Sequence, residues 1–117
     1  MSSEKSLELS TRTEHGIFML EGWSVGEEYH PVYRELIDKL IVYFRRNERL
    51  VLYFNLQLFD KRSLSYILKI LGLLNVEFRK GRNITVKWGW TSNTSLMKAT
   101  GKDLKELCDF SFELFEA

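Results

Sequence analysis

The sequence predicts an α/β domain with one mixed sheet and with helices mainly on one face of that sheet. The first observation is the order of the elements: two strand-like segments open the chain, and three helical segments then alternate with three further strands, giving ββαβαβαβ. The second is that strands alternating with helices favour a single layered sheet. The third is the length of 117 residues, which suits one domain. We therefore expect a single domain over residues 1–117, in which only the first few residues are candidates for disorder.

The first two strands are predicted as a hairpin, and a helix follows them. Leu7–Thr11 alternates apolar and polar residues, and Gly16–Trp23 comes after a short polar turn. The predicted helix, Pro31–Arg46, begins with a proline that fits a first turn and ends with two arginines that suit a helix C-terminus. Asn47 is the predicted cap. Its apolar residues keep a helical period: Val32, Tyr33, Leu36, Ile37, Leu40, Ile41 and Phe44.

A central strand is predicted at Arg49–Phe59 and a second helix at about Lys61–Lys80. The strand is nearly all apolar, so we expect one fully covered face and one partly covered face. The covered face is predicted to hold Leu50, Leu52, Phe54, Leu56 and Leu58. Gly81 is the predicted helix C-cap, and Gly72 costs up to about 1 kcal/mol relative to Ala unless it allows close packing. The residues predicted to point inward from this helix are Leu64, Ile67, Leu68, Leu71 and Leu74.

The last third of the chain predicts a strand, a helix and a closing strand. Asn83–Trp90 alternates as a strand does, and a polar loop follows at Thr91–Ser95. Ser95–Cys108 is a weaker amphipathic helix that we expect to be interrupted at Gly101. Phe110–Phe115 is the predicted closing strand.

Composition excludes several function classes. Seventeen basic and sixteen acidic residues leave a net charge of +1, which gives no electrostatic case for a nucleic-acid or membrane partner. No apolar run approaches the roughly 20 residues of a membrane span, and the first residues lack the apolar core of a signal peptide. The only cysteine, Cys108, cannot form an internal disulfide. A cytoplasmic protein is expected.

The usual chemical motifs are missing. His15 and His30 lie in predicted loops far from Cys108, without the spacing of a metal site, and Cys108 is expected to be a buried, inert thiol on the inner side of the third helix. Neither a P-loop nor a dinucleotide-binding glycine motif occurs. We therefore expect no catalytic residue, no metal and no cofactor, and a protein that is not an enzyme.

The junction Asp60-Lys61-Arg62-Ser63 is the one segment whose residue pattern is a candidate for a functional site. It follows the central strand and opens the second helix, where open α/β sheets tend to bind ligands. Asp60 suits an N-cap that accepts from the N–H of Arg62 or Ser63. The two cations oppose the helix dipole, because partial positive charge already gathers at a helix N-terminus. The junction is either a capped helix start with exposed cations or a binding site.

Short matches spread from Gly22 to Glu113 make the chain resemble the SiaC-type family of bacterial regulatory phosphoproteins. They are Gly22–Glu27 before the first helix; Tyr33, Ile37-Asp38 and Tyr43-Phe44 within it; Lys80-Gly81 followed by Ile84–Trp90; and Gly101 with Phe110–Phe112. The resemblance implies a STAS-like fold, similar to that of anti-sigma-factor antagonists. It also implies a regulator that binds a diguanylate cyclase and a partner kinase of the anti-sigma type, with a link to cyclic-di-GMP signalling and biofilm formation.

The same resemblance assigns the family's switch to the junction. The family has Asn-Thr-Ser-Ser there and its Thr is phosphorylated, whereas this chain has Lys61 at the matching position. Lysine is not an acceptor for a Ser/Thr kinase, and its charge is opposite to that of a phosphate. The acidic run that follows in the family is replaced by Asn93, Thr94, Ser95 and Leu96. Asp60, Lys61, Arg62 and Ser63 are the predicted partner-binding residues, and Ser63 is the alternative phosphoacceptor.

Two other functions stay open at this point. A small-anion or nucleotide-binding domain could use the Asp60–Ser63 helix N-terminus and its cations. A structural partner subunit could instead use Trp23, Trp88 and Trp90 as an interface if these side chains are exposed.

Overall fold

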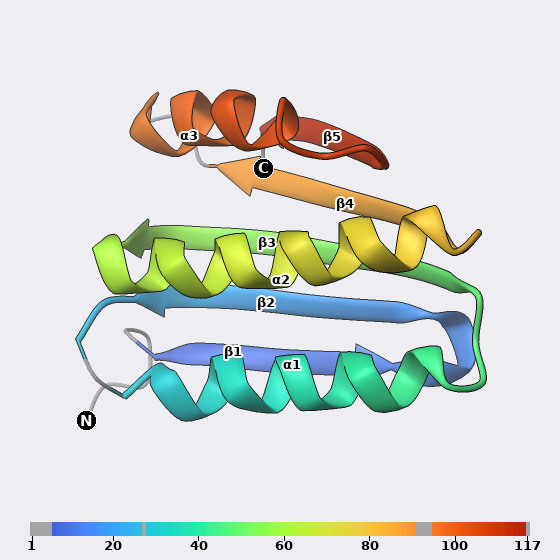
Figure 1. Cartoon of the computed structure of the whole chain (residues 1–117). Helices are drawn as coiled ribbons and strands as arrows, with labels where there is room; N and C mark the ends of the chain where they lie inside the picture. The colour runs from blue at the N-terminus through green and yellow to red at the C-terminus, as the bar shows by residue number, and fades with distance from the viewer. Residues whose placement is uncertain (1–5, 27, 91–94, 117) are drawn as a thin grey trace.

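The computed structural model describes residues 6–26, 28–90 and 95–116. Residues 91–94 of the predicted loop Thr91–Ser95 and the first five residues lie outside this part. The described elements, in chain order, are β1 (Leu7–Arg12), the short 3-10 turn η2 (Thr13–His15), β2 (Ile17–Ser24), α1 (His30–Phe44), β3 (Arg49–Phe59), α2 (Lys61–Arg79), β4 (Asn83–Trp90), α3 (Ser95–Lys105) and β5 (Ser111–Glu116) (Figure 1).

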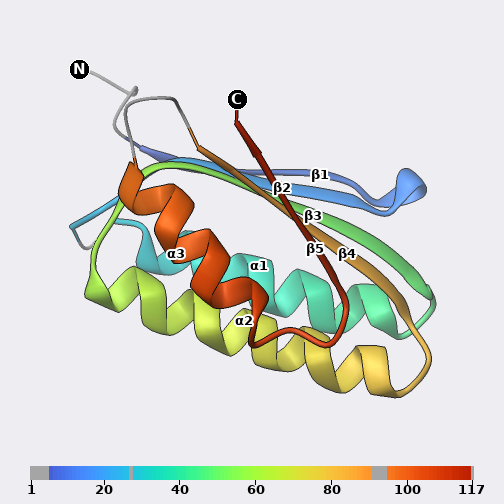
Figure 2. The ribbon, with the colours of Figure 1, turned by 90° about the horizontal axis from the view of Figure 1, so that it is seen from above.

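The predicted fold class is confirmed. The sheet has five strands in the spatial order β1-β2-β3-β4-β5. β1 pairs antiparallel with β2, while β2, β3, β4 and β5 are parallel neighbours. All three helices of the described chain lie on one side of this mixed sheet (Figure 2). Because the parallel strands run the same way, the ends of β2 and β3 and the starts of α1 and α2 gather at one edge of the molecule (Figure 1).

The core lies between the sheet and the helices. On the strands it contains alternate residues, as the period-2 pattern of β3 predicts. Phe54 and Trp88 are fully buried neighbours on β3 and β4, with ring centroids 5.4 Å apart. The tyrosines Tyr29, Tyr33 and Tyr43 are also buried, as expected of packing residues. On the other face of the sheet, Val51, Tyr53 and Asn55 are half-buried, which confirms a partly covered second face.

Two leucines that the hydrophobic pattern predicts to be buried are exposed. The pairing of β2 with β3 shifts register after Gly22, which pairs with Leu56 while Trp23 pairs with Leu58. This bulge ends the alternation, so Leu58 is 41% exposed rather than buried with Leu56. Leu68, predicted to point inward from α2, is 42% exposed. The prediction that both belong to the core is therefore wrong.

The third helix also differs from its prediction. It runs through Gly101 without interruption and ends at Lys105, so Cys108 lies beyond it. A Cβ on Gly101 would lie 2.5 Å from Trp88 Cδ1, so this glycine lets α3 pack directly on the Trp88 ring. Burial raises the pKa of the Cys108 thiol to about 11, with Asp109 adding to the effect.

The tryptophans do not form a common exposed surface. Trp88 is fully buried and Trp90 is 9% exposed, while Trp23 is half-buried. The indole N–H of Trp88 donates to the Met97 carbonyl at 2.8 Å, so even its polar atom is used within the core. An interface built on Trp88 and Trp90 is therefore wrong for this conformation. None of the helices in residues 6–26, 28–90 and 95–116 is both long and apolar enough to cross a membrane.

Candidate functional site: the β3–α2 junction

The junction is formed where β2 and β3 end side by side. β2 ends at Ser24 and β3 ends at Phe59, and these two residues pair in the sheet. The next residue, Asp60, donates its N–H to the Ser24 carbonyl at 3.2 Å. The sheet register therefore brings two polar segments, remote in sequence, to the start of α2.

Asp60 is the N-cap of α2, as predicted. Its backbone is extended, and its Oδ1 accepts from the Ser63 N–H at 3.0 Å, the pattern that satisfies a free helix N–H. The Tyr29 hydroxyl donates to the same oxygen at 2.8 Å. Burial raises the pKa of Asp60, but the hydrogen bonds from Ser63 and Tyr29 outweigh this effect and hold the pKa below its ordinary value. Asp60 is therefore a carboxylate at neutral pH.

Ser63 is part of a buried hydroxyl network. Both Ser63 and Ser24 are 0% exposed. Ser63 Oγ lies 2.6 Å from the Ser24 carbonyl and 3.0 Å from Asp60 Oδ1, and it accepts from Ser24 Oγ at 2.6 Å. Ser24 Oγ also lies 2.8 Å from the hydroxyl of Tyr33. In this conformation the Ser63 hydroxyl ties the end of β2 to the first turn of α2, and it is closed to solvent.

A cluster of aromatic side chains connects the starts of α1 and α2 next to this network. The rings of Tyr33 on α1 and Tyr66 on α2 stack with centroids 5.0 Å apart and planes only 2° from parallel. His30 Nδ1 and the Tyr66 hydroxyl form a 2.8 Å hydrogen bond. Burial raises the pKa of Tyr33 to about 12, so its hydroxyl keeps its proton. Ser24, Tyr33 and Tyr66 were not among the predicted site residues. Ser24 and Tyr33 lie within the short family matches of the sequence, and the tyrosines near the starts of both helices are a further signal.

Lys61 and Arg62 place positive charge on the surface of the junction. Both side chains are exposed, and together with Gly26 and Asp60 they line a shallow pocket. The four predicted residues therefore divide into two pairs. Asp60 and Ser63 hold the helix start, and Lys61 and Arg62 face solvent.

The model of the family described as "SiaC family regulatory phosphoprotein" matches residues 2–117 of the chain. The chain belongs to the SiaC family. Three solved structures share its fold at 18% sequence identity. One is a chain of the complex of the diguanylate cyclase SiaD with its activator SiaC from Pseudomonas aeruginosa, with a TM-score of 0.89, covering 99% of this chain and 96% of that chain.

The other two are SiaC structures from the same organism. Apo-SiaC has a TM-score of 0.84 and covers 97% of this chain and 93% of that chain. A further SiaC structure has a TM-score of 0.86 and covers 100% of this chain and 95% of that chain. No curated protein sequence matches the chain.

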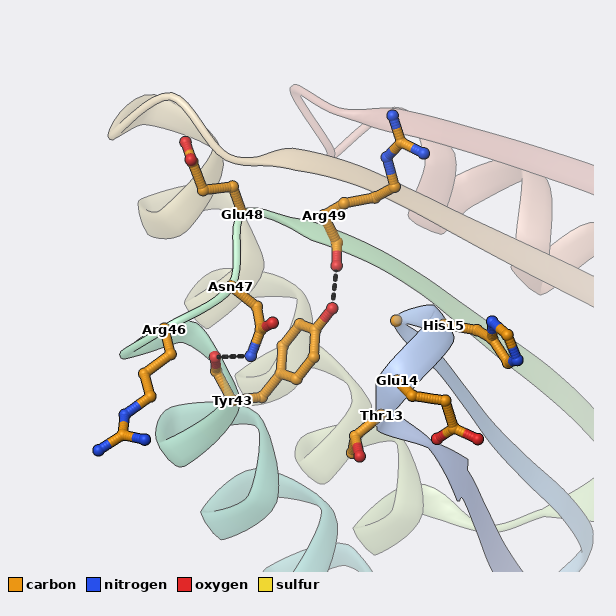
Figure 3. A pocket seen from close by; sticks show the side chains of 9 residues that line it. Thr13, Glu14, His15, Tyr43, Arg46, Asn47, Glu48 and Arg49 are labelled. Atoms are coloured by element: carbon orange, nitrogen blue, oxygen red, sulfur yellow. Dashed lines mark hydrogen bonds between the residues drawn. The ribbon is translucent and has the colours of Figure 1, made fainter.

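A second pocket of this SiaC-family chain lies near the opposite end of the sheet, between η2 and the end of α1 (Figure 3). The Tyr43 hydroxyl donates to the Arg49 carbonyl, and the Asn47 side chain donates to the Tyr43 carbonyl at 2.9 Å. The prediction that Asn47 caps α1 is wrong, because the C-cap is Arg45; Asn47 instead uses its side chain to satisfy a carbonyl of the last turn. The side chains of Arg46 and Arg49 extend away from these hydrogen bonds and do not converge on a common point (Figure 3). Tyr43 and Asn47 of this pocket therefore hold the end of α1 and the start of β3 together. Within the described residues, no group of three His, Cys, Asp or Glu side chains could hold a metal.

Proposed function

We propose that this SiaC-family chain is a non-enzymatic regulator that binds a diguanylate cyclase through the β3–α2 junction. The observation that carries the proposal is the exposed pair Lys61 and Arg62 on a helix start that Asp60 caps. It is supported by the family match and by the likeness to a complex that contains a cyclase and its activator SiaC. The raised pKa of Cys108 also argues against a nucleophilic role, because the thiolate is scarce at neutral pH.

Lys61 gives this junction a fixed positive charge where the family resemblance places a phosphorylatable Thr. Phosphorylation of such a residue adds nearly two negative charges at the helix start. Lys61 cannot undergo this change, so binding through this position is constitutive in our proposal. The matching surface on the partner is acidic, because opposite charges favour encounter and register.

Alanine substitution of both cations tests the docking site. Each exposed charge contributes about 0.2–1 kcal/mol, so Lys61→Ala/Arg62→Ala should weaken binding to the host's diguanylate cyclase roughly two- to thirtyfold. The affinity is measured by isothermal titration calorimetry, and the difference should shrink as salt is raised. The matched control is Lys102→Ala/Lys105→Ala, which removes two exposed charges from α3. Equal affinities for the two double variants would refute the assignment.

The missing switch can be tested by restoring it. Lys61→Thr places a hydroxyl at the exposed first position of α2. We expect the host's anti-sigma-type kinase to phosphorylate this variant and not the wild-type chain, because the Ser63 hydroxyl is buried and engaged. Phosphate analysis by mass spectrometry locates any modified residue. Phosphorylation of wild-type Ser63 would contradict this proposal and would require the junction to open.

An anion or nucleotide site is the second candidate, favoured by the pocket that Gly26, Lys61 and Arg62 line. The Asp60 carboxylate already accepts the Ser63 N–H and places negative charge where the anion would lie. We therefore expect nucleotides and phosphorylated metabolites to leave the melting temperature unchanged in a thermal-shift screen. A specific stabilisation that disappears in Lys61→Ala would favour this second function.

A further inference from the structure

The outer face of α2 carries two exposed apolar side chains, Leu68 and Val76, with a glycine between them. With about 100° of turn per residue, six exposed positions fall within about 40° of Gly72 around the helix axis. They are Lys61, Ser65, Leu68, Gly72, Val76 and Arg79, all exposed. Leu68 is 42% and Val76 49% exposed, and they lie one helical turn on either side of Gly72. Figure 2 shows α2 on the helix side of the molecule, away from the sheet.

Neither packing within the chain nor backbone conformation requires a glycine at position 72. A Cβ at this position would meet nothing within 4 Å, in contrast to the tight contacts that a Cβ on Gly101 would make. Its φ angle is not in the left-handed region either. A mid-helix glycine costs about 1 kcal/mol relative to alanine, so α2 is weaker than it need be at an exposed site. A glycine in such a place allows another backbone to approach closely.

The charges of α2 indicate the chemistry of the occupant. Lys61 and Arg62 lie at its start and Lys69 lies beside Leu68. The only acid of the helix, Glu77, is half-buried and pairs with Lys80 and Arg82. Arg79 at the far end is already paired with Asp109 at 2.7 Å. A second copy of this face would bring like charges together, whereas an acidic element would find its complement at the Lys61 end.

We propose that the outer face of α2 receives an amphipathic helix of a protein partner. The partner's apolar side chains lie over Gly72 between Leu68 and Val76, and its acidic side chains lie near Lys61 and Lys69. An amphipathic helix binds such a face through its apolar anchors, and a small residue at the crossing point lets the two helix axes come close. The inference rests on the proposed function, since it names how the partner docks beyond the junction.

A bulky residue at position 72 tests this docking directly. Gly72→Trp fills space that is empty in the chain itself, so the variant should fold. Val42→Trp is the matched control, because Val42 is an exposed apolar residue on α1, 57% exposed. We expect Gly72→Trp to weaken binding to the host's cyclase about tenfold or more, as the loss of a central contact does, and Val42→Trp to leave it unchanged. Equal cyclase affinities for wild type and Gly72→Trp would overturn the inference and leave the proposed function standing.

Failure of the chain to bind any cyclase would refute the proposed function and would leave the helix-docking inference to be tested separately. A peptide titration provides that separate test. The probe is a stapled helical peptide with a leucine stripe and glutamates at one end, and its control carries lysines in place of the glutamates. Added to the full-length labelled chain, the acidic peptide should shift the amide signals of Leu68, Gly72 and Val76, and Gly72→Trp should abolish these shifts. Shifts elsewhere, equal shifts with the lysine peptide, displacement by phosphatidylglycerol vesicles, or a dimer that Gly72→Trp dissociates would each overturn the inference.

Discussion

Replacing Ser63 by alanine should destabilise the fold. The substitution removes buried hydrogen bonds between the end of β2 and the start of α2, and water does not reach this site to replace them. The side chain is 0% exposed and bonds the Ser24 carbonyl and Ser24 Oγ, both at 2.6 Å. Ser24 keeps the Asp60 N–H and the Tyr33 hydroxyl as partners, so the cost is that of the lost hydrogen bonds. Two such bonds contribute about 1–3 kcal/mol together, while alanine regains up to about 0.5 kcal/mol of helix propensity. The expected net loss is about 2 kcal/mol. For 117 residues, at about 2.1 cal/mol/K per residue, this corresponds to about 8 °C in melting temperature.

The assay is thermal unfolding followed by circular dichroism, with urea unfolding to obtain the free energy. The control is Ser65→Ala, which removes an exposed hydroxyl two residues along the same helix and should change stability by less than about 0.5 kcal/mol. Ser24→Ala combined with Ser63→Ala should cost less than the sum of the two single changes, because both act on one network. If Ser63→Ala melts at the same temperature as Ser65→Ala, the structural role of Ser63 is refuted.

Three further predictions follow from the same geometry. The pKa of Asp60 is held below its ordinary value, so its stabilising effect is complete above the unfolded pKa of about 3.9 and is lost as pH falls through the folded value. The unfolding free energy of Asp60→Asn, measured between pH 5 and 2, should therefore fall less steeply than that of the wild type. Gly72→Ala should raise the unfolding free energy by up to about 1 kcal/mol, since nothing surrounds the new methyl group. Gly101→Ala should lower it by about 1–3 kcal/mol, because the methyl group would collide with Trp88; urea unfolding of both glycine variants checks the opposite signs.

Local patterns were sufficient to predict most of the fold. The predicted bounds of β3 and β4 match the structure, because strand alternation and the flanking polar residues are both short-range signals. The N-cap of α2 was also predictable, since Asp60 needs only the N–H three residues on. The first helix was predicted two residues too long at its end, as α1 stops at Phe44. Helix ends fray, and arginines that suit a C-terminus do not fix its last residue.

The features that were missed depend on contacts between distant residues. The bulge that exposes Leu58 arises from pairing with β2, which the alternation within β3 does not reveal. The sequence predicts an interruption of the helix at Gly101, yet this glycine lets α3 pack on Trp88. The bond between Ser24 and Ser63 joins residues 39 apart, and no local pattern in the sequence indicates it. The candidate site was located from the sequence, but the inward and outward roles of its residues were not.

These two roles explain why cations are tolerated at the start of α2. The ionised Asp60 carboxylate, held by Tyr29 and Ser63, supplies the negative charge that a helix N-terminus favours. Because Lys61 directly follows this carboxylate in the chain, the attraction between the two charges offsets part of the unfavourable interaction of Lys61 with the helix dipole. A phosphoryl group at the same position would instead add negative charge beside an anion. Lys61 thus follows an ionised residue in the chain, and Lys61 and Arg62 are the exposed charges of the junction, as the proposed docking to an acidic partner surface requires.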